Sequence, residues 1–331
     1  DDGDYFWSYS YNPEKNNFRY MYVWTVIGSL LSDAEYSETE FKDFLIRECS
    51  YREFTGSSWV GKTEPAKPAA PMSENSASSS FEDIHEAATA GSLAGVMHFV
   101  EKGTPVNTPD TYGRTPLMHA ATDGKSPELI AYLIQVGADV NAKHEGGENV
   151  LFEMATRGDV DIEIARLILG AGIDLAYSHP NYGTVLAWAA NCGRTELVRL
   201  LIERGADVNA GAEKKESPIA QAMMGGHHEI VKLLFAAGAG ANSKNYGGWT
   251  LLEYATEEND KELVKAILAR QKEQETPVNS EAMVKAAEQG NISMLKLLLK
   301  EGVDVNGRSS WGRETPLMKA AYYGKAKAAA W

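Results

Sequence analysis

The chain has 331 residues, of which 44 % are hydrophobic and 24 % charged, a balance that is ordinary for a globular protein. Its formal net charge of −14 disfavours partners that are themselves anionic, such as nucleic acids and acidic membranes. No run of about 18 apolar residues could span a bilayer, and Cys49 and Cys192 provide neither a disulfide framework nor the spacing of a metal site.

The first 60 residues are rich in aromatic side chains and predict a small α+β domain. Residues 18–27 mix aromatic and β-branched types, which favours a strand. The sequence Ser-Glu-Thr-Glu at 37–40 has the spacing of a capping box and predicts a helix over about 38–48. We expect residues 51–60 to form a second strand, which gives a β-α-β layer. Because so small a unit buries little apolar area, we expect it to pack against the rest of the chain or against a partner.

Residues 61–80 predict a flexible linker, because serine, alanine and proline dominate and too little apolar surface is present to order them. The sequence Gly61-Lys62-Thr63 is similar to the end of a phosphate-binding loop. It lacks the upstream glycine at the required spacing, and a proline-rich stretch follows it in place of a helix. We therefore expect no nucleotide site here.

A repeat organises the remainder of the chain. In its clearest copy, Thr115-Pro-Leu is followed by Ala120-Ala121, Gly124, an apolar helix and Gly137-Ala-Asp-Val-Asn141. The same frame returns at intervals of about 33 residues. Its copies open at Glu82, Thr115, Asn149, Thr184, Ser217, Thr250, Glu281 and Thr315.

These motifs resemble ankyrin repeats, and the resemblance covers about residues 81–331. It implies a mostly α-helical solenoid of about eight units, each with a helix, a tight turn, a second helix and a loop. The chain departs from the family at the position after Thr-Pro-Leu, where the family usually has histidine and only His85 keeps it. The resemblance also implies protein binding through a concave face, without catalysis.

Glycines and small residues set the expected geometry within each unit. The alanine pair of the first helix allows close approach of neighbouring helices, and a glycine with positive φ is expected to end that helix. Those glycines are Gly91, Gly124, Gly158, Gly193, Gly226 and Gly290. A glycine is expected to end the second helix in the same way, but the sixth unit has none over residues 269–279, so its second helix is expected to run on.

The repeat frame leaves free the loop tips and the outward positions of the first helices. Large aromatic side chains stand at many of these positions, although the frame does not need them, and tyrosine and tryptophan are enriched in binding hot spots. Some of them could instead pack between neighbouring tips. The predicted partner-binding residues are Tyr112, His119, Tyr182, Trp188, Tyr246, Trp249, Tyr254, Trp311, Tyr322 and Tyr323.

Catalytic motifs are not found in the sequence. It contains no nucleophile elbow, no zinc-protease helix motif and no dinucleotide fingerprint. The run His227-His228-Glu229 invites a metal interpretation, but adjacent side chains diverge on a helix, so we expect a turn and a helix start. We expect no catalytic residues, no bound metal and no cofactor.

We therefore expect a non-catalytic module that binds a partner protein, in the sharper form an inhibitor or immunity protein of an effector or toxin enzyme. The start without methionine and the first 60 residues, which resemble N-terminal modules of bacterial secreted proteins, favour a bacterial source and a periplasmic or secreted location. Two alternatives stay open. The N-terminal domain could bind a small ligand or be catalytic, with the repeats as its delivery scaffold, or the chain could be a passive scaffold.

Overall fold

A computed structural model describes residues 10–12, 17–19, 52–55, 58–61, 81–211, 217–276, 278, 280–309 and 313–331. Contacts within the chain divide it into two compact units. The first contains Asp1–Ala87 and Leu93–Gly103, and the second contains Ala88–Ser92 and Thr104–Trp331.

The first unit contains two short antiparallel hairpins. Strand β1 (Ser10–Asn12) pairs with β2 (Asn17–Arg19), and β3 (Arg52–Thr55) pairs with β4 (Ser58–Gly61). The single strand expected over 51–60 is therefore wrong, because this stretch turns back and pairs with itself. The helix expected over 38–48 and most of the strand expected over 18–27 lie outside the described residues, as does the predicted linker beyond Gly61.

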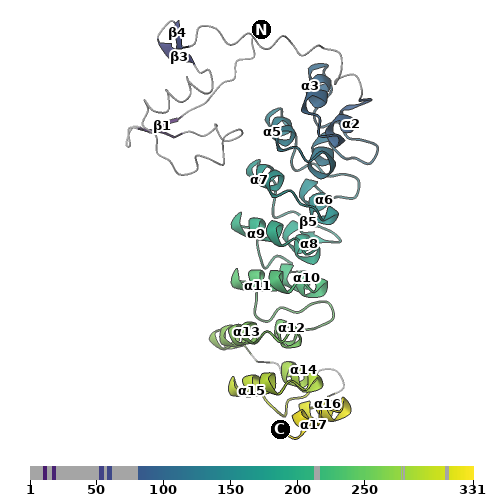
Figure 1. Ribbon diagram of the computed structural model, residues 1–331, viewed down its shortest axis with the longest axis vertical. Helices are drawn as coiled ribbons and strands as arrows, with labels where there is room; N and C mark the ends of the chain where they lie inside the picture. Colours follow the sequence, from purple (N-terminus) through teal and green to yellow (C-terminus); the bar gives the residue numbers. More distant parts are fainter. Residues whose placement is uncertain are drawn as a thin grey trace. The chain divides into compact units, whose positions relative to one another are not determined.

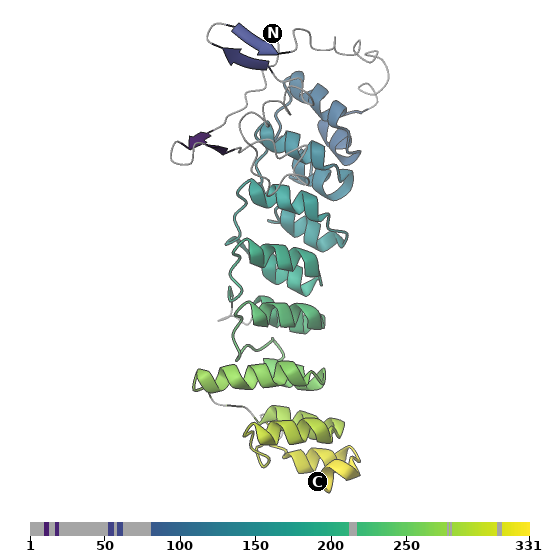
Figure 2. The same ribbon diagram turned by 60° about the vertical axis from the view of Figure 1, so that its left-hand side comes forward.

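Helix pairs follow from residue 84 onward, and those of the second unit are stacked one after another (Figures 1 and 2). The first pair is α2 (Ile84–Thr89) and α3 (Leu93–Glu101). The later pairs are α4 (Pro116–His119), continued by the π-turn η1 (Ala120–Gly124), with α5 (Pro127–Gln135); α6 (Val150–Arg157) with α7 (Ile162–Gly170); α8 (Val185–Asn191) with α9 (Thr195–Glu203); α10 (Pro218–Gly225) with α11 (His228–Ala236); α12 (Leu251–Glu257) with α13 (Lys261–Glu273); α14 (Glu281–Gln289) with α15 (Ile292–Lys300); and α16 (Pro316–Tyr322) with α17 (Ala326–Ala329). A two-residue ladder of β5 (Ser178–His179) with β6 (Gly183–Thr184) closes the loop before α8.

The residues that open the repeats also start the helices. The side chains of these residues accept hydrogen bonds from backbone N–H groups of the first turn, which satisfies donors that have no partner inside the helix. The caps are Thr115, Asn149, Thr184, Ser217, Thr250 and Thr315. The alanines that follow them, such as Ala155, Ala189 and Ala222, are completely buried. The predicted α-solenoid of ankyrin-like units is thus confirmed.

The turn after the first helix uses the expected positive φ at Gly91, Gly158, Gly193, Gly226 and Gly290. The expected positive φ at Gly124 is wrong, because in the second repeat Lys125 adopts the left-handed conformation instead, with φ of 45°. The π-turn η1 adds one residue there, because the Lys125 N–H donates to the carbonyl of Ala120. Gly124 is needed for a different reason, since a Cβ atom on it would lie 2.2 Å from the carbonyl oxygen of Ala88.

Helix α13 is longer than the other second helices, as the missing glycine predicted. Its end is closed by Glu275, which adopts a φ of 51° where other repeats have glycine. The extension brings Gln271, which is 3 % exposed, against the preceding repeat. Its Nε2 donates to Asn242 Oδ1 at 2.8 Å and to the carbonyl of Ala241 at 3.3 Å.

Asparagine side chains in the loops after the second helices form hydrogen bonds that link consecutive repeats. In each case the asparagine Nδ2 donates to a backbone carbonyl of the following repeat, and its Oδ1 accepts from the backbone N–H that lies two residues after that carbonyl. The residues are Asn107, Asn141 and Asn209. Each side chain thereby satisfies two backbone groups of a turn that has no ladder of its own. In the fifth repeat Asn242 bonds to Gln271 instead.

Candidate protein-binding surface

The first-helix face is defined here as the loop tips before each first helix together with the outward residues of these helices. Five of the ten predicted binding residues lie exposed on it. Tyr112 and Tyr322 are 70 % and 79 % exposed, while Tyr246, Trp249 and Tyr323 are 52 %, 38 % and 46 % exposed. Trp311 lies outside the described residues. These five rings are therefore the exposed members of the predicted set, although Lys285 lies over the Trp249 ring and Lys319 over the Tyr323 ring.

Tyr182 and Trp188 form an aromatic stack that is only half-buried. The Tyr182 ring lies 4.4 Å from the His179 ring on one side and 4.2 Å from the Trp188 ring on the other, measured between centroids. Trp188 Nε1 donates to Thr156 Oγ1 of the preceding repeat at 2.8 Å. The rings therefore serve the packing between tips as well as the surface, so truncating either would disturb the fold.

Tyr254 is not on the surface, in contrast to the prediction. It is 5 % exposed, and its ring packs 5.9 Å from that of His228, because the loop and helix start of the preceding repeat cover this slot. Burial, followed by the negative charge of Glu258, raises the pKa of the Tyr254 hydroxyl to about 12. Within the part of the chain that the structure describes, this hydroxyl has no hydrogen-bond partner.

His119 also differs from the free surface residue that was expected. Its Nε2 lies 2.9 Å from Asp110 Oδ2, and its Nδ1 lies 3.2 Å from Thr89 Oγ1. Burial opposes the ionisation of Asp110, but hydrogen bonds from His119 and from the backbone N–H groups of Arg114 and Tyr112 outweigh burial and lower the pKa of Asp110. His119 is thus held within a polar network.

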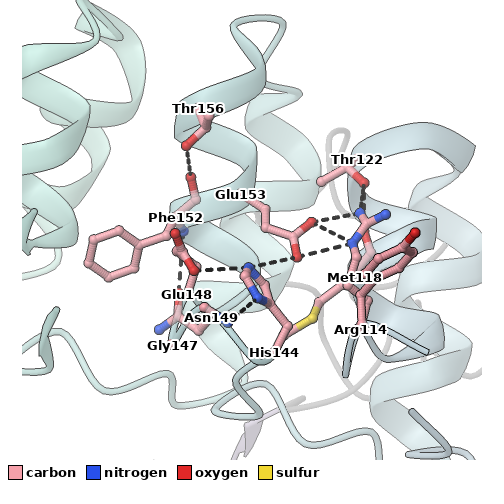
Figure 3. Close-up of polar contacts among 12 residues, drawn as sticks. Arg114, Met118, Thr122, His144, Gly147, Glu148, Asn149, Phe152, Glu153 and Thr156 are labelled. Carbon is pink, nitrogen blue, oxygen red and sulfur yellow. Dashed lines mark hydrogen bonds and ion pairs between the residues drawn. The ribbon is translucent and has the colours of Figure 1, made fainter. Parts of the chain in front are cut away.

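Arg114 is the centre of that network, which was not predicted (Figure 3). Its guanidinium donates from Nε and Nη2 to the Glu153 carboxylate of the next repeat, at 3.0 and 2.6 Å, and from Nη2 to Thr122 Oγ1 at 2.9 Å. His144 lies 3.1 Å from Glu148 and 3.7 Å from Glu153. The Arg114 and Glu153 side chains are only 16 % and 10 % exposed, so the pair fixes the junction between the second and third repeats.

One sequence signal could have revealed this pair. Arg114 directly precedes the Thr-Pro-Leu motif, and Glu153 occupies the outward first-helix position of the next repeat. Opposite charges at these two positions lie side by side when repeats stack. The same stacking brings Lys285 of the seventh repeat over the Trp249 ring of the sixth, at 4.8 Å.

The region around His227 contains the predicted turn and helix start. His227 Nε2 lies 2.9 Å from the carbonyl oxygen of Asn191, and His228 Nε2 lies 2.9 Å from Asp260 Oδ2. Among the described residues, no group of three or more histidine, cysteine or acidic side chains could hold a metal ion. No described helix is long and apolar enough to cross a membrane.

Comparison with known proteins agrees with the repeat architecture. A family model described as "Ankyrin repeats (3 copies)" matches residues 82–144, 124–212, 186–279 and 252–331. Protein phosphatase 1 regulatory subunit 27 of Homo sapiens and that of Mus musculus are each 38 % identical to this chain over 65 residues. The match covers 20 % of this chain and 42 % of each relative, so less than half the length of these curated relatives is spanned.

Proposed function

This chain belongs to the ankyrin-repeat family, and on that premise we propose that it binds a partner protein through its first-helix face and regulates it. The family and the regulatory-subunit relative point to a non-catalytic, protein-binding role. The observation that carries the proposal is the set of aromatic rings on this face. Tyr112, Tyr246 and Tyr322 are more than half exposed, although the repeat frame requires no large side chain at these positions.

The partner that we propose is an enzyme whose activity the chain restrains, as an inhibitor or immunity protein does. The relative supports a regulatory role, since its name describes a regulatory subunit of a phosphatase. A protein phosphatase catalytic subunit is therefore the first candidate partner to test, and a toxin or effector enzyme is the second. We also propose a bacterial source and a periplasmic or secreted location, because the first 60 residues resemble N-terminal modules of bacterial secreted proteins.

The test combines affinity capture with an enzyme assay. The immobilised chain is compared with the variant Tyr112→Ala/Tyr246→Ala/Tyr322→Ala, because these exposed rings can be removed without opening the core. Loss of hot-spot residues costs about 2 kcal/mol or more each, so the variant should lose the partner while its thermal midpoint stays unchanged. The control is Leu299→Ala, which removes an exposed side chain from the second helix α15.

The captured enzyme is then assayed with and without the purified chain. A fall in its activity with the wild type, and none with the tyrosine variant, is the expected result. Equal capture by the wild type and the tyrosine variant would refute binding through this face. Binding without any change in activity would leave an interaction module and refute the regulatory part.

A further inference from the structure

The first helix of the eighth repeat, α16, presents an apolar surface to solvent. Leu317 is 61 % exposed and Met318 is 54 % exposed. Ala321, one turn further along the helix, is exposed as well. Residues at i, i+1 and i+4 share one side of an α-helix. These three side chains therefore form a single surface, which we call the end face.

The position that Leu317 occupies is buried in the preceding repeats. In the second to seventh repeats the equivalent residues are at most 1 % exposed, namely Leu117, Leu151, Leu186, Ile219, Leu252 and Met283. Every first helix from α4 to α14 packs against the first helix of the next repeat. In both views, α16 and α17 lie at the end of the stack beyond α14 and α15, and no described helix follows them (Figures 1 and 2). The end face is thus a stacking surface that no described helix covers.

A helix is the element that such a surface receives elsewhere in this chain. Small side chains at the contact allow two helices to approach closely, because the interaxial distance depends on the side chains between them. The alanines equivalent to Ala321 in four earlier repeats are at most 3 % exposed, namely Ala121, Ala155, Ala190 and Ala287. A helix that covers Leu317 and Met318 would remove both side chains from water, which is favourable.

The region around the end face is basic, although the chain as a whole is acidic. Residues 281–331 contain eight lysines and arginines and five aspartates and glutamates, a formal charge of +3 in a chain of −14. From Thr315 onward there are three lysines and no acidic residue. Lys319 pairs with Glu314, whereas none of the ion pairs among the described residues involves Lys325 or Lys327. This end of the stack therefore attracts an acidic segment.

Charge also decides between kinds of occupant. A second copy joined through the same face would place two basic surfaces together, which opposes a tail-to-tail dimer. An acidic membrane or a nucleic acid is extended, so it would also meet the acidic remainder of the chain. A short helix avoids that repulsion, because charges further away than about 8–10 Å are largely screened.

We propose that the end face binds an acidic amphipathic helix of a partner protein. The inference goes beyond the proposed function, because it concerns the stacking side of α16 and not the first-helix face. The apolar stripe of the bound helix packs on Leu317 and Met318, as the next repeat does on the earlier first helices. Acidic side chains beside that stripe lie near Lys325 and Lys327.

Fluorescence anisotropy of the full chain tests the proposal. The probe is a fluorescein-labelled peptide of about 18 residues, with leucine and alanine on one helical face and glutamate and glutamine on the other. One comparison peptide has lysine in place of glutamate, and another has the same composition in scrambled order. We expect saturable binding of the acidic amphipathic peptide, about tenfold weaker binding of the lysine peptide and none of the scrambled peptide.

Two variants remove the two parts of the surface. Leu317→Ala/Met318→Ala should weaken binding of the acidic peptide about tenfold, and Lys325→Gln/Lys327→Gln should weaken it about fivefold. Neither changes a buried side chain, so far-UV circular dichroism and the thermal midpoint should stay as in the wild type. Absence of binding by the wild type, or binding by both variants as tight as by the wild type, would overturn the proposal.

Matched controls lie on the second helix α15 of the preceding repeat. Leu299→Ala removes a side chain that is 45 % exposed, and Lys296→Gln/Lys300→Gln makes the same charge change at two exposed positions. Both should bind the acidic peptide within about twofold of the wild type. Equal weakening by the variants and their controls would mean that bulk charge or general adhesion explains the binding, which overturns the proposal.

Two further measurements identify a different occupant. Light scattering at rising concentration reports a second copy, if the molar mass of the wild type increases and that of Leu317→Ala/Met318→Ala does not. Co-sedimentation with phosphatidylglycerol vesicles reports a lipid surface, if the wild type binds and the same variant does not. Either result would overturn the proposal, whereas a monomer that ignores the vesicles and binds the acidic peptide supports it.

Discussion

Removing the Glu153 carboxylate is the most informative test of how the repeats are joined. Arg114 donates three hydrogen bonds to this carboxylate, from Nε to both oxygens and from Nη2 to Oε2, and both side chains are at most 16 % exposed. The variant Glu153→Ala leaves the guanidinium with Thr122 and with Asp123, whose Oδ2 is 3.7 Å away. Breaking a buried ion pair by removing one partner costs roughly 3–5 kcal/mol. Because Asp123 remains nearby, we expect a loss at the lower end, about 3 kcal/mol.

The double replacement Arg114→Leu/Glu153→Leu separates the effect of an unpaired buried charge from the effect of lost packing. Two apolar side chains leave no buried charge, and such exchanges are often neutral in stability. We therefore expect the double variant to lie within about 1 kcal/mol of the wild type, well above the single variant. The control is Glu262→Ala, which breaks the exposed pair with Lys265 and should cost less than about 1 kcal/mol.

Urea titration followed by far-UV circular dichroism measures these differences from the midpoint and the slope of the transition. Hydrogen exchange of amides in α4 and α6 shows whether the loss is local to this junction, since repeat stability is a sum of unit and interface terms. The reasoning is refuted if Glu153→Ala costs no more than the exposed control. It is also refuted if the double variant is as unstable as the single one, because packing and not an uncompensated charge would then explain the loss.

Three further changes test other contacts. Asp110→Asn should cost about 1–2 kcal/mol at pH 7. Because the pKa of Asp110 is lowered in the folded state, this difference in urea titrations should begin to shrink below about pH 3.9 and be lost once the pH falls through the lowered folded-state pKa. Glu253→Gln should raise the urea midpoint at pH 7 but not at pH 3. Burial raises the pKa of Glu253 in the folded state, with hydrogen bonds from Thr250 opposing this shift and repulsion from Glu281 adding to it. Ionisation of Glu253 therefore destabilises the fold as the pH rises above about 4.3. An unchanged or lower midpoint at pH 7 would contradict this sign. Asn141→Ala removes the bonds to the Gly172 carbonyl and the Asp174 N–H and should cost about 1 kcal/mol in a thermal or urea transition, an effect that a matched Asn181→Ala change at an exposed tip should not produce.

The sequence by itself determined the repeat and the helices of its units. The cap residues such as Thr115, the buried alanines such as Ala189, and the missing glycine that lets α13 run on all act within a few residues of their own position. Such local effects can be read from spacing, because capping and turn geometry depend on neighbouring residues only.

Only the tertiary structure decided which side chains are free. Tyr254 and Trp188 occupy the same position in their repeats, yet Tyr254 is buried against His228 while Trp188 is half-exposed and bonded to Thr156. His119 was expected on the first-helix face and instead bonds with Asp110, and Glu153, at the corresponding position of the next repeat, bonds with Arg114. For Trp188 and Glu153 the outcome depends on a side chain of the adjacent repeat, 32 and 39 residues away, and Tyr254 is likewise covered by His228 of the preceding repeat. A single repeat therefore specifies its own helices, but its surface is completed by its neighbours.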